Sequence, residues 1–213
     1  MNIIKRSFKY RDYSLVYWLI GINILIFAAP MLFGDRLHYL LLERMAMIPL
    51  MVIYKKWFWT FVTYMFIHEG FSHILFNMLG LLIFGTQVEK QMGSFEFLLY
   101  YLVTGTLAGI FSFAVYYFTH SYFITLIGAS GALFAVELAY AVFFPNSVLY
   151  LWGILPIRAP VMVLGFTALE LIFAFTARNS NIAHLTHLAG FGVGWVYFLV
   201  RFGVNPWRRL TGH

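Results

Sequence analysis

A serine stands between small residues in the segment GASG, Gly128 to Gly131, inside a long apolar stretch. Polar side chains within a membrane are costly, and by default they mark function. A serine hydroxyl becomes a good nucleophile when a base accepts its proton, and a neutral imidazole does this near neutral pH. His187, in a later apolar segment, is the candidate base. Ser130 and His187 are therefore predicted to form a catalytic pair.

Two further polar residues have a spacing that suits the same chemistry. His73 and Asn77 are four residues apart in HILFN, so on a helix both side chains point the same way. An imidazole N–H and an amide N–H stabilise the oxyanion that forms during acyl transfer. The two aspartates, Asp12 and Asp35, lie at or beyond the ends of the first apolar span. No obvious carboxylate is left to orient the base, and a serine–histidine dyad is predicted.

The composition predicts that these residues lie in a membrane protein. Of the 213 residues, 62% are hydrophobic and only 10% are charged. A soluble domain of this size needs a far more polar surface. The absence of cysteine excludes disulfides and thiolate metal sites. The net charge of +6 comes from Lys and Arg at segment flanks and termini, which are topology signals. The lipid bilayer, and not nucleic acid, is the expected partner.

Six segments approach the length of about 20 apolar residues that a membrane helix needs. Residues 1–213 are accordingly predicted to form one all-α domain, a bundle of six transmembrane helices. The predicted spans are residues 14–33, 73–88, 95–118, 122–144, 159–177 and 182–201.

The connection between the first two spans, residues 34–72, is neither a polar loop nor a span. Charged residues divide it into apolar pieces too short to cross the bilayer. Trp-rich amphipathic pieces of this kind lie at the membrane interface. A half-submerged interfacial loop is therefore predicted beside the bundle.

An even number of spans places both termini on one side of the membrane. The arm before the first span carries Lys5, Arg6, Lys9 and Arg11, and the last segment adds three arginines at 201, 208 and 209. Positive charge marks the cytoplasmic side. The expected protein is a multi-pass protein of the cell (inner) membrane with both termini in the cytoplasm.

Small residues predict close packing of the fourth and sixth spans. Gly131 is followed at intervals of four by two alanines, and Gly190 and Gly194 form a GxxxG motif. Such spacing lets two helix backbones approach closely, which would bring Ser130 and His187 within reach. Phe134, one turn after the serine, is expected to pack against the imidazole.

Taken together, these motifs resemble the rhomboid family of intramembrane serine proteases. The matching residues, in the order of the family, are Trp59, Thr63, Phe66, His68, the segment His73 to Asn77, Val88-Glu89-Lys90, Gly93, Gly128 to Gly131, and His187 to Gly190 with Gly194. The chain has Trp59-Thr60 where the family often has Trp-Arg.

The resemblance implies a role for each matched polar residue. Ser130 would be the nucleophile, His187 the base, and His73 and Asn77 would stabilise the oxyanion. It also implies transmembrane protein substrates with small or helix-weakening residues, cleaved without a metal or cofactor.

Two other function classes compete with this interpretation. Four histidines, at positions 68, 73, 184 and 187, are enough to hold haem or a metal in an electron carrier, although Ser130 and Asn77 then have no role. A rhomboid-like protein that binds membrane segments without cutting them is the other.

Single residues also have structural interpretations. A membrane serine commonly bonds a backbone carbonyl or joins a packing face. His184 is expected to be solvated or to cap its helix. Glu137 is expected to be protonated, hydrogen-bonded and structural, and the role of Glu170 is left open.

Overall fold

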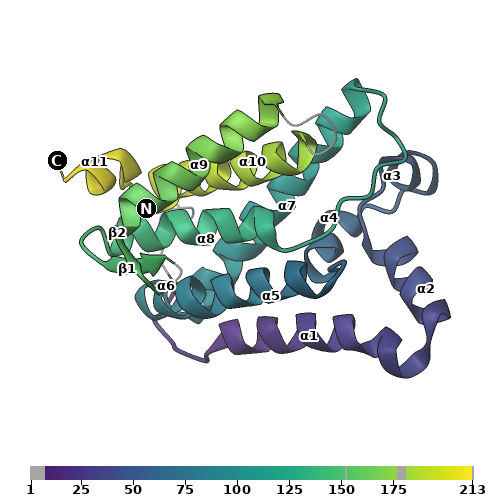
Figure 1. The fold of residues 1–213 in the computed structure, drawn as a ribbon, viewed down its shortest axis with the longest axis horizontal. Helices are drawn as coiled ribbons and strands as arrows, with labels where there is room; N and C mark the ends of the chain where they lie inside the picture. Colours follow the sequence, from purple (N-terminus) through teal and green to yellow (C-terminus); the bar gives the residue numbers. More distant parts are fainter. Residues whose placement is uncertain (1–7, 152, 177–180, 213) are drawn as a thin grey trace.

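The computed structural model describes residues 8–151, 153–176 and 181–212, without the side chains of residues 181 and 182. Lys5, Arg6, residue 177 and the ends of the predicted 1–213 domain lie outside the described residues. The described chain is mostly helical (Figure 1). Its helices are α1 Leu15–Phe33, α2 Asp35–Met45, α3 Pro49–Lys55, α4 Thr60–Thr63, α5 Phe71–Gly80, α6 Thr86–Met92, α7 Ser94–Phe118, α8 Ser130–Phe143, α9 Ala159–Thr176, α10 Asn181–Tyr197 and α11 Pro206–Thr211.

Short irregular turns complete three of these elements. A 3₁₀ turn, Tyr64–Phe66, follows α4, and π-helical turns cover Leu81–Gly85 and Phe198–Phe202. The first π turn joins α5 and α6 into one continuous segment, Phe71–Met92. The second expected span is therefore longer at both ends than residues 73–88.

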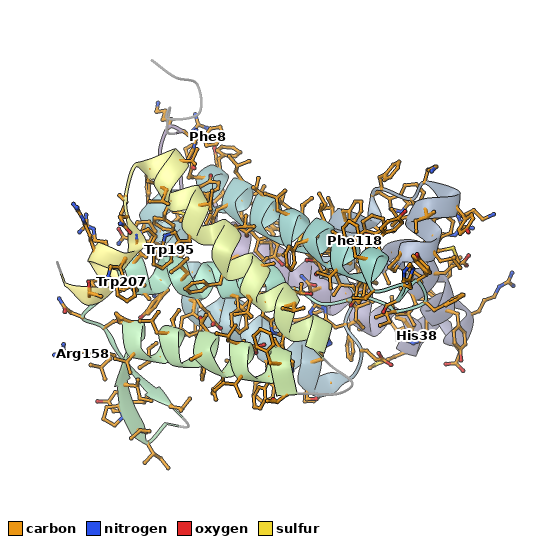
Figure 2. All side chains as sticks on the ribbon, turned by 90° about the horizontal axis from the view of Figure 1, so that it is seen from above. Phe8, His38, Phe118, Arg158, Trp195 and Trp207 are labelled. Atoms are coloured by element: carbon orange, nitrogen blue, oxygen red, sulfur yellow. The ribbon has the colours of Figure 1, made fainter. Side chains whose placement is uncertain are left out.

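A small antiparallel hairpin was not expected from the sequence. Strands β1 Val148–Leu151 and β2 Leu155–Arg158 pair with Val148 opposite Arg158. The hairpin connects α8 to α9 and projects from one end of the helices (Figures 1 and 2). The pairing satisfies backbone groups that a connection outside the helices would otherwise leave open.

Within the described residues, five helical segments are long and apolar enough to cross a membrane. They are Leu15–Phe33, Phe71–Met92, Ser94–Phe118, Ala159–Thr176 and Ala183–Phe202. Their outer faces carry many exposed large apolar side chains (Figure 2), and α1 buries only three of its residues. Such surfaces are compatible with lipid rather than water.

The fourth expected span, residues 122–144, is wrong at its start. The helix begins at Ser130 and has 14 residues. Gly128 has φ +104°, a conformation that L side chains rarely adopt and that no helix contains. Residues 122–129 instead run as an irregular segment, in which Leu126 and Met47 exchange two backbone hydrogen bonds.

Helix α8 lies at the centre of the fold. Every residue from Gly131 to Val142 is buried except Phe134. Helix α10 packs closely against it: a Cβ built on Gly190 would overlap the carbonyl oxygen of Gly131. One helical turn later, a Cβ on Gly194 would lie 3.0 Å from that of Ala135. The contact is nearly backbone against backbone, as small residues permit.

The connection from α2 to α5 is anchored by its own side chains. The Trp59 indole donates to the carbonyl of Arg44 at 2.9 Å, and the Thr63 hydroxyl donates to that of Met45 at 2.7 Å. Thr60, which stands where the family often has arginine, is buried and donates to the carbonyl of Trp57 at 2.6 Å. The loop is thus fixed without that arginine.

The same connection also holds the segment that precedes Ser130. The Gly128 N–H donates to the carbonyl of Tyr64 at 3.0 Å, and the Ala129 N–H donates to His68 Nε2 at 3.4 Å. His68 is 5% exposed. Burial, followed by the neighbouring His73, lowers the pKa of His68 from 6.5 to about 4. The ring is therefore neutral near pH 7 and able to accept.

We expect Gly190→Ala to destabilise the protein by about 1–3 kcal/mol, because the new methyl group must push α10 away from the Gly131 carbonyl. Gly192→Ala is the matched control on the same helix, since nothing lies within 4 Å of its added Cβ. Thermal unfolding in detergent measures both. Equal unfolding temperatures for the two variants would contradict the close contact.

We expect stability to fall when the pH is lowered from 7.5 to 5. His68 binds a proton below pH 6.5 when unfolded but only near pH 4 when folded, so its contribution is complete above pH 6.5 and is lost towards pH 4. The slope is at most about 1.4 kcal/mol per pH unit. His68→Gln should flatten the profile, whereas His38→Gln should not. Parallel profiles for His68→Gln and the native chain would contradict this origin.

Candidate active site

Ser130 and His187 meet between α8 and α10. The Oγ of Ser130, the first residue of α8, lies 2.7 Å from Nε2 of His187. The ring of Phe134 stacks on the imidazole, with centroids 4.7 Å apart and planes inclined by 6°. The expected packing of Phe134 is confirmed. This stacking restrains the imidazole plane in the orientation that points Nε2 at the hydroxyl.

A carboxylate also lies beside the imidazole, so the expectation that none could orient it is wrong. Oε2 of Glu170, on α9, is 3.1 Å from Nδ1 of His187. The contact is not aligned as a hydrogen bond, and that nitrogen is buried without another partner. A negative charge there favours a proton on Nδ1, which leaves Nε2 free to accept one from Ser130.

The same carboxylate oxygen accepts a hydrogen bond from His184, 2.6 Å away at Nδ1. This pairing with Glu170 is a role that the expected solvation or capping of His184 did not include. The side chains of His184, His187 and Glu170 are 20%, 19% and 16% exposed, respectively. Their three ligand atoms lie within 4.8 Å of one another, close enough to hold a metal ion.

His73 and Asn77 line the cavity that contains Ser130 and His187. Its volume is about 410 Å³, and Gly128 forms part of its wall. The Asn77 amide N–H₂ donates to the carbonyl of His73 at 2.8 Å, and its Oδ1 is buried without a partner. A Cβ built on Gly128 would come within 2.5 Å of His73 Nε2. Glycine at position 128 is therefore what allows the backbone before Ser130 to approach this ring.

A second cavity, of about 430 Å³, adjoins Ser130 between α5, α8 and α9. Its walls are mostly apolar, and they include Phe76, Leu169 and Phe173 as well as Glu137 and Glu170. Oε2 of Glu137 is buried without a hydrogen-bond partner, so the predicted hydrogen-bonded role does not hold for that atom. The cavity offers an apolar space beside the serine.

The four histidines of the competing haem interpretation fall into two pairs. The rings of His68 and His73 are 5.0 Å apart, whereas His184 and His187 are 6.3 Å apart and face Glu170. The pairs have different surroundings, since His68 is tied to the backbone of Ala129. The two pairs therefore do not form one set of four ligands for a haem or a metal, and each pair has its own local contacts.

Glu170 is the residue of this site that the sequence did not assign. A signal was present: it is a carboxylate within an apolar segment, and two histidines three residues apart begin the next segment. Buried charges require partners. To predict that this carboxylate faces the two histidines, one must know how α9 and α10 are rotated relative to each other. The sequence does not specify that rotation.

Comparison with known proteins places the sequence in a family. The family model named Rhomboid domain matches residues 55–204. The chain is 33% identical over 153 residues to RHOMBOID-like protein 12, mitochondrial, of Arabidopsis thaliana, covering 63% of this chain and 44% of that protein.

Two further relatives come from a bacterium and a yeast. The putative rhomboid protease YdcA of Bacillus subtilis is 29% identical over 65% of this chain and 64% of its own length. Rhomboid protein 1, mitochondrial, of Saccharomyces cerevisiae is 27% identical over 89% of this chain and 54% of its own length. The chain thus spans less than two thirds of each of these three relatives. With its rhomboid domain match over residues 55–204 and its membrane-spanning helices, the chain belongs to the rhomboid family of membrane proteins.

Proposed function

We propose that the protein is an intramembrane serine endopeptidase that cleaves transmembrane segments of other membrane proteins with a Ser130–His187 dyad. The observation that carries the proposal is the distance of 2.7 Å between the serine Oγ and the imidazole Nε2. It is a hydrogen-bond distance between a nucleophile and its base. The rhomboid protease name of a relative supports the same class of reaction.

The proposed reaction follows from this pair. Ser130 Oγ attacks the carbonyl carbon of the substrate peptide bond while His187 Nε2 accepts the hydroxyl proton. The imidazolium then donates that proton to the leaving amine nitrogen, and an acyl-enzyme remains. A water molecule, deprotonated by the same nitrogen, releases the acyl group and restores the serine.

Glu170 supports the base in this reaction. Its carboxylate, 3.1 Å from Nδ1 of His187, stabilises the imidazolium that forms when Nε2 takes the proton. Because it also holds His184, it has a fixed position on α9 rather than a mobile one. The dyad thereby has an electrostatic partner, contributed by glutamate.

Three groups near Ser130 are suited to the oxyanion. His73 and Asn77 line its cavity from α5, and Ser130 is the first residue of α8. The first N–H groups of a helix have no partner within it and carry partial positive charge. A carbonyl oxygen beside Ser130 therefore has backbone and side-chain donors within the same cavity.

The membrane arrangement belongs to the same proposal. The proposed six spans are the five long helical segments and the short helix α8. Because protein surrounds α8, this helix needs less length than a helix that faces lipid. In Figure 1 the start of α1 and helix α11 lie at one end of the bundle, while α5, α8 and α10 begin at the other. With the basic flanks, this supports a single domain with both termini cytoplasmic, a half-submerged loop near the opposite face and a location in the cell membrane.

The substrate must fit this arrangement. Helical carbonyls are shielded by their own hydrogen bonds, so a membrane segment must unwind before it is cut. Segments with small or helix-weakening residues do so at lower cost. The apolar cavity beside Ser130 provides space for the unwound chain.

We expect Ser130→Ala and His187→Ala each to abolish cleavage of a model transmembrane substrate while leaving the protein folded. Each removes one of two groups that act as a unit, so losses of about 10⁴ or more in kcat are expected. A serine-reactive fluorophosphonate should label the native chain and not Ser130→Ala. An inert native chain that still binds membrane segments would favour the non-cutting alternative.

We expect Asn77→Ala to lower kcat more than it raises KM, because an oxyanion donor acts mainly in the transition state. Loss of one donor costs about 3 kcal/mol in other hydrolases, and less is expected here since His73 and a backbone N–H share the load. Steady-state kinetics of Asn77→Ala, His73→Ala and the double variant measure this. An unchanged kcat in the double variant would remove both residues from the mechanism.

A further inference from the structure

We propose that Glu170, His184 and His187 form a reversible site for a divalent cation, best suited to Zn²⁺, and that the bound cation switches the enzyme off. The inference rests on the proposed function for its effect on activity, although not for the binding itself. The site would share His187 with the catalytic pair.

The ligand atoms come from two packed helices and converge on one point. His184 and His187 are three residues apart on α10 and therefore lie on one face. Each directs Nδ1 towards Oε2 of Glu170 on α9, at 2.6 and 3.1 Å. A cation placed between the carboxylate oxygen and the two nitrogens would replace these direct contacts. Shifts of the three side chains are enough to bring their atoms to metal–ligand distances of about 2.0–2.2 Å.

The donor set selects the kind of cation. Two imidazole nitrogens and one carboxylate oxygen suit Zn²⁺ and related transition metals better than Mg²⁺ or Ca²⁺, which prefer oxygen. Three protein ligands leave a fourth position for water. The residues are 16–20% exposed, and Glu170 lines the cavity beside Ser130, so a hydrated cation has a route to them.

The structure also holds an atom that lacks a good partner. Nδ1 of His187 is buried, and its contact with Glu170 is not aligned as a hydrogen bond. Buried polar groups without such a partner are rare and call for an explanation. A cation bound by the two histidines and the carboxylate would be the missing partner of this nitrogen.

Binding would act directly on the catalytic proton. In the active state the His187 proton resides on Nδ1, and Nε2 accepts from Ser130 at 2.7 Å. A cation on Nδ1 forces the neutral ring to carry its proton on Nε2, which then donates to the serine instead. The base cannot accept, so the hydroxyl stays protonated and unreactive.

The binding experiment uses the full-length Ser130→Ala protein, so that it does not depend on activity. Zn²⁺ titrated by calorimetry should bind in a 1:1 ratio, and Co²⁺ should give a visible absorption band. Adding His184→Ala should weaken binding by at least about tenfold, the lower end of what even outer-shell partners contribute. Adding His73→Ala, a histidine of the same cavity outside the cluster, should not. Equal binding by both double variants would overturn the site.

The activity experiment compares the native chain with His184→Ala and His184→Asn, each measured relative to its own rate without metal. Zn²⁺ should inhibit the native chain, a chelator should restore it, and both variants should need at least about tenfold more Zn²⁺ for half inhibition. Unchanged sensitivity in both variants would overturn the switch. Activity that a chelator abolishes and Zn²⁺ restores would overturn the switch and the serine mechanism together. Activity retained by Ser130→Ala would overturn the mechanism alone, since the binding result stands separately.

Discussion

The approach of α10 to α8 is the constraint on which the rest of the site depends. The Gly190 position has no room for a Cβ because the Gly131 carbonyl occupies it. This contact sets the separation and rotation of the two helices one residue from Ser130 and three residues from His187. Side chains at either glycine would separate the helices, and the hydroxyl and imidazole would lose the 2.7 Å contact. The geometry of the proposed dyad is thus a consequence of backbone packing.

The burial of α8 within the protein also allows this helix to be short. A helix surrounded by protein does not need to match the bilayer thickness, and the chain before it can be irregular where it lines a cavity. Three N–H groups of this segment, those of Leu126, Gly128 and Ala129, donate to the α2–α5 connection, at Met47, Tyr64 and His68. The connection thus fixes the direction in which the chain enters α8. Ser130 gains the open N–H groups of a helix start and access to the cavity.

Much of this arrangement could be predicted from local sequence. Apolar length identified the lipid-facing helices, and the spacing of small residues identified the face on which α8 and α10 meet. Features that depend on tertiary geometry could not be read in the same way. The apolar run before Gly128 resembles a helix in composition, but the run is irregular in the structure, and the positive φ of that glycine is not a helical conformation. The role of Glu170 was left open, because its partners depend on how α9 is rotated against α10.

Glu170 connects the two properties inferred for this site. A half-buried carboxylate between two imidazoles needs compensation, and the two Nδ1 atoms supply it when both carry protons. That protonation pattern is also the one that leaves His187 Nε2 able to accept from Ser130. A cation on the same atoms compensates the carboxylate equally well but requires the opposite tautomer. The two states satisfy one charge in mutually exclusive ways, so catalytic competence and cation binding compete for the same nitrogen.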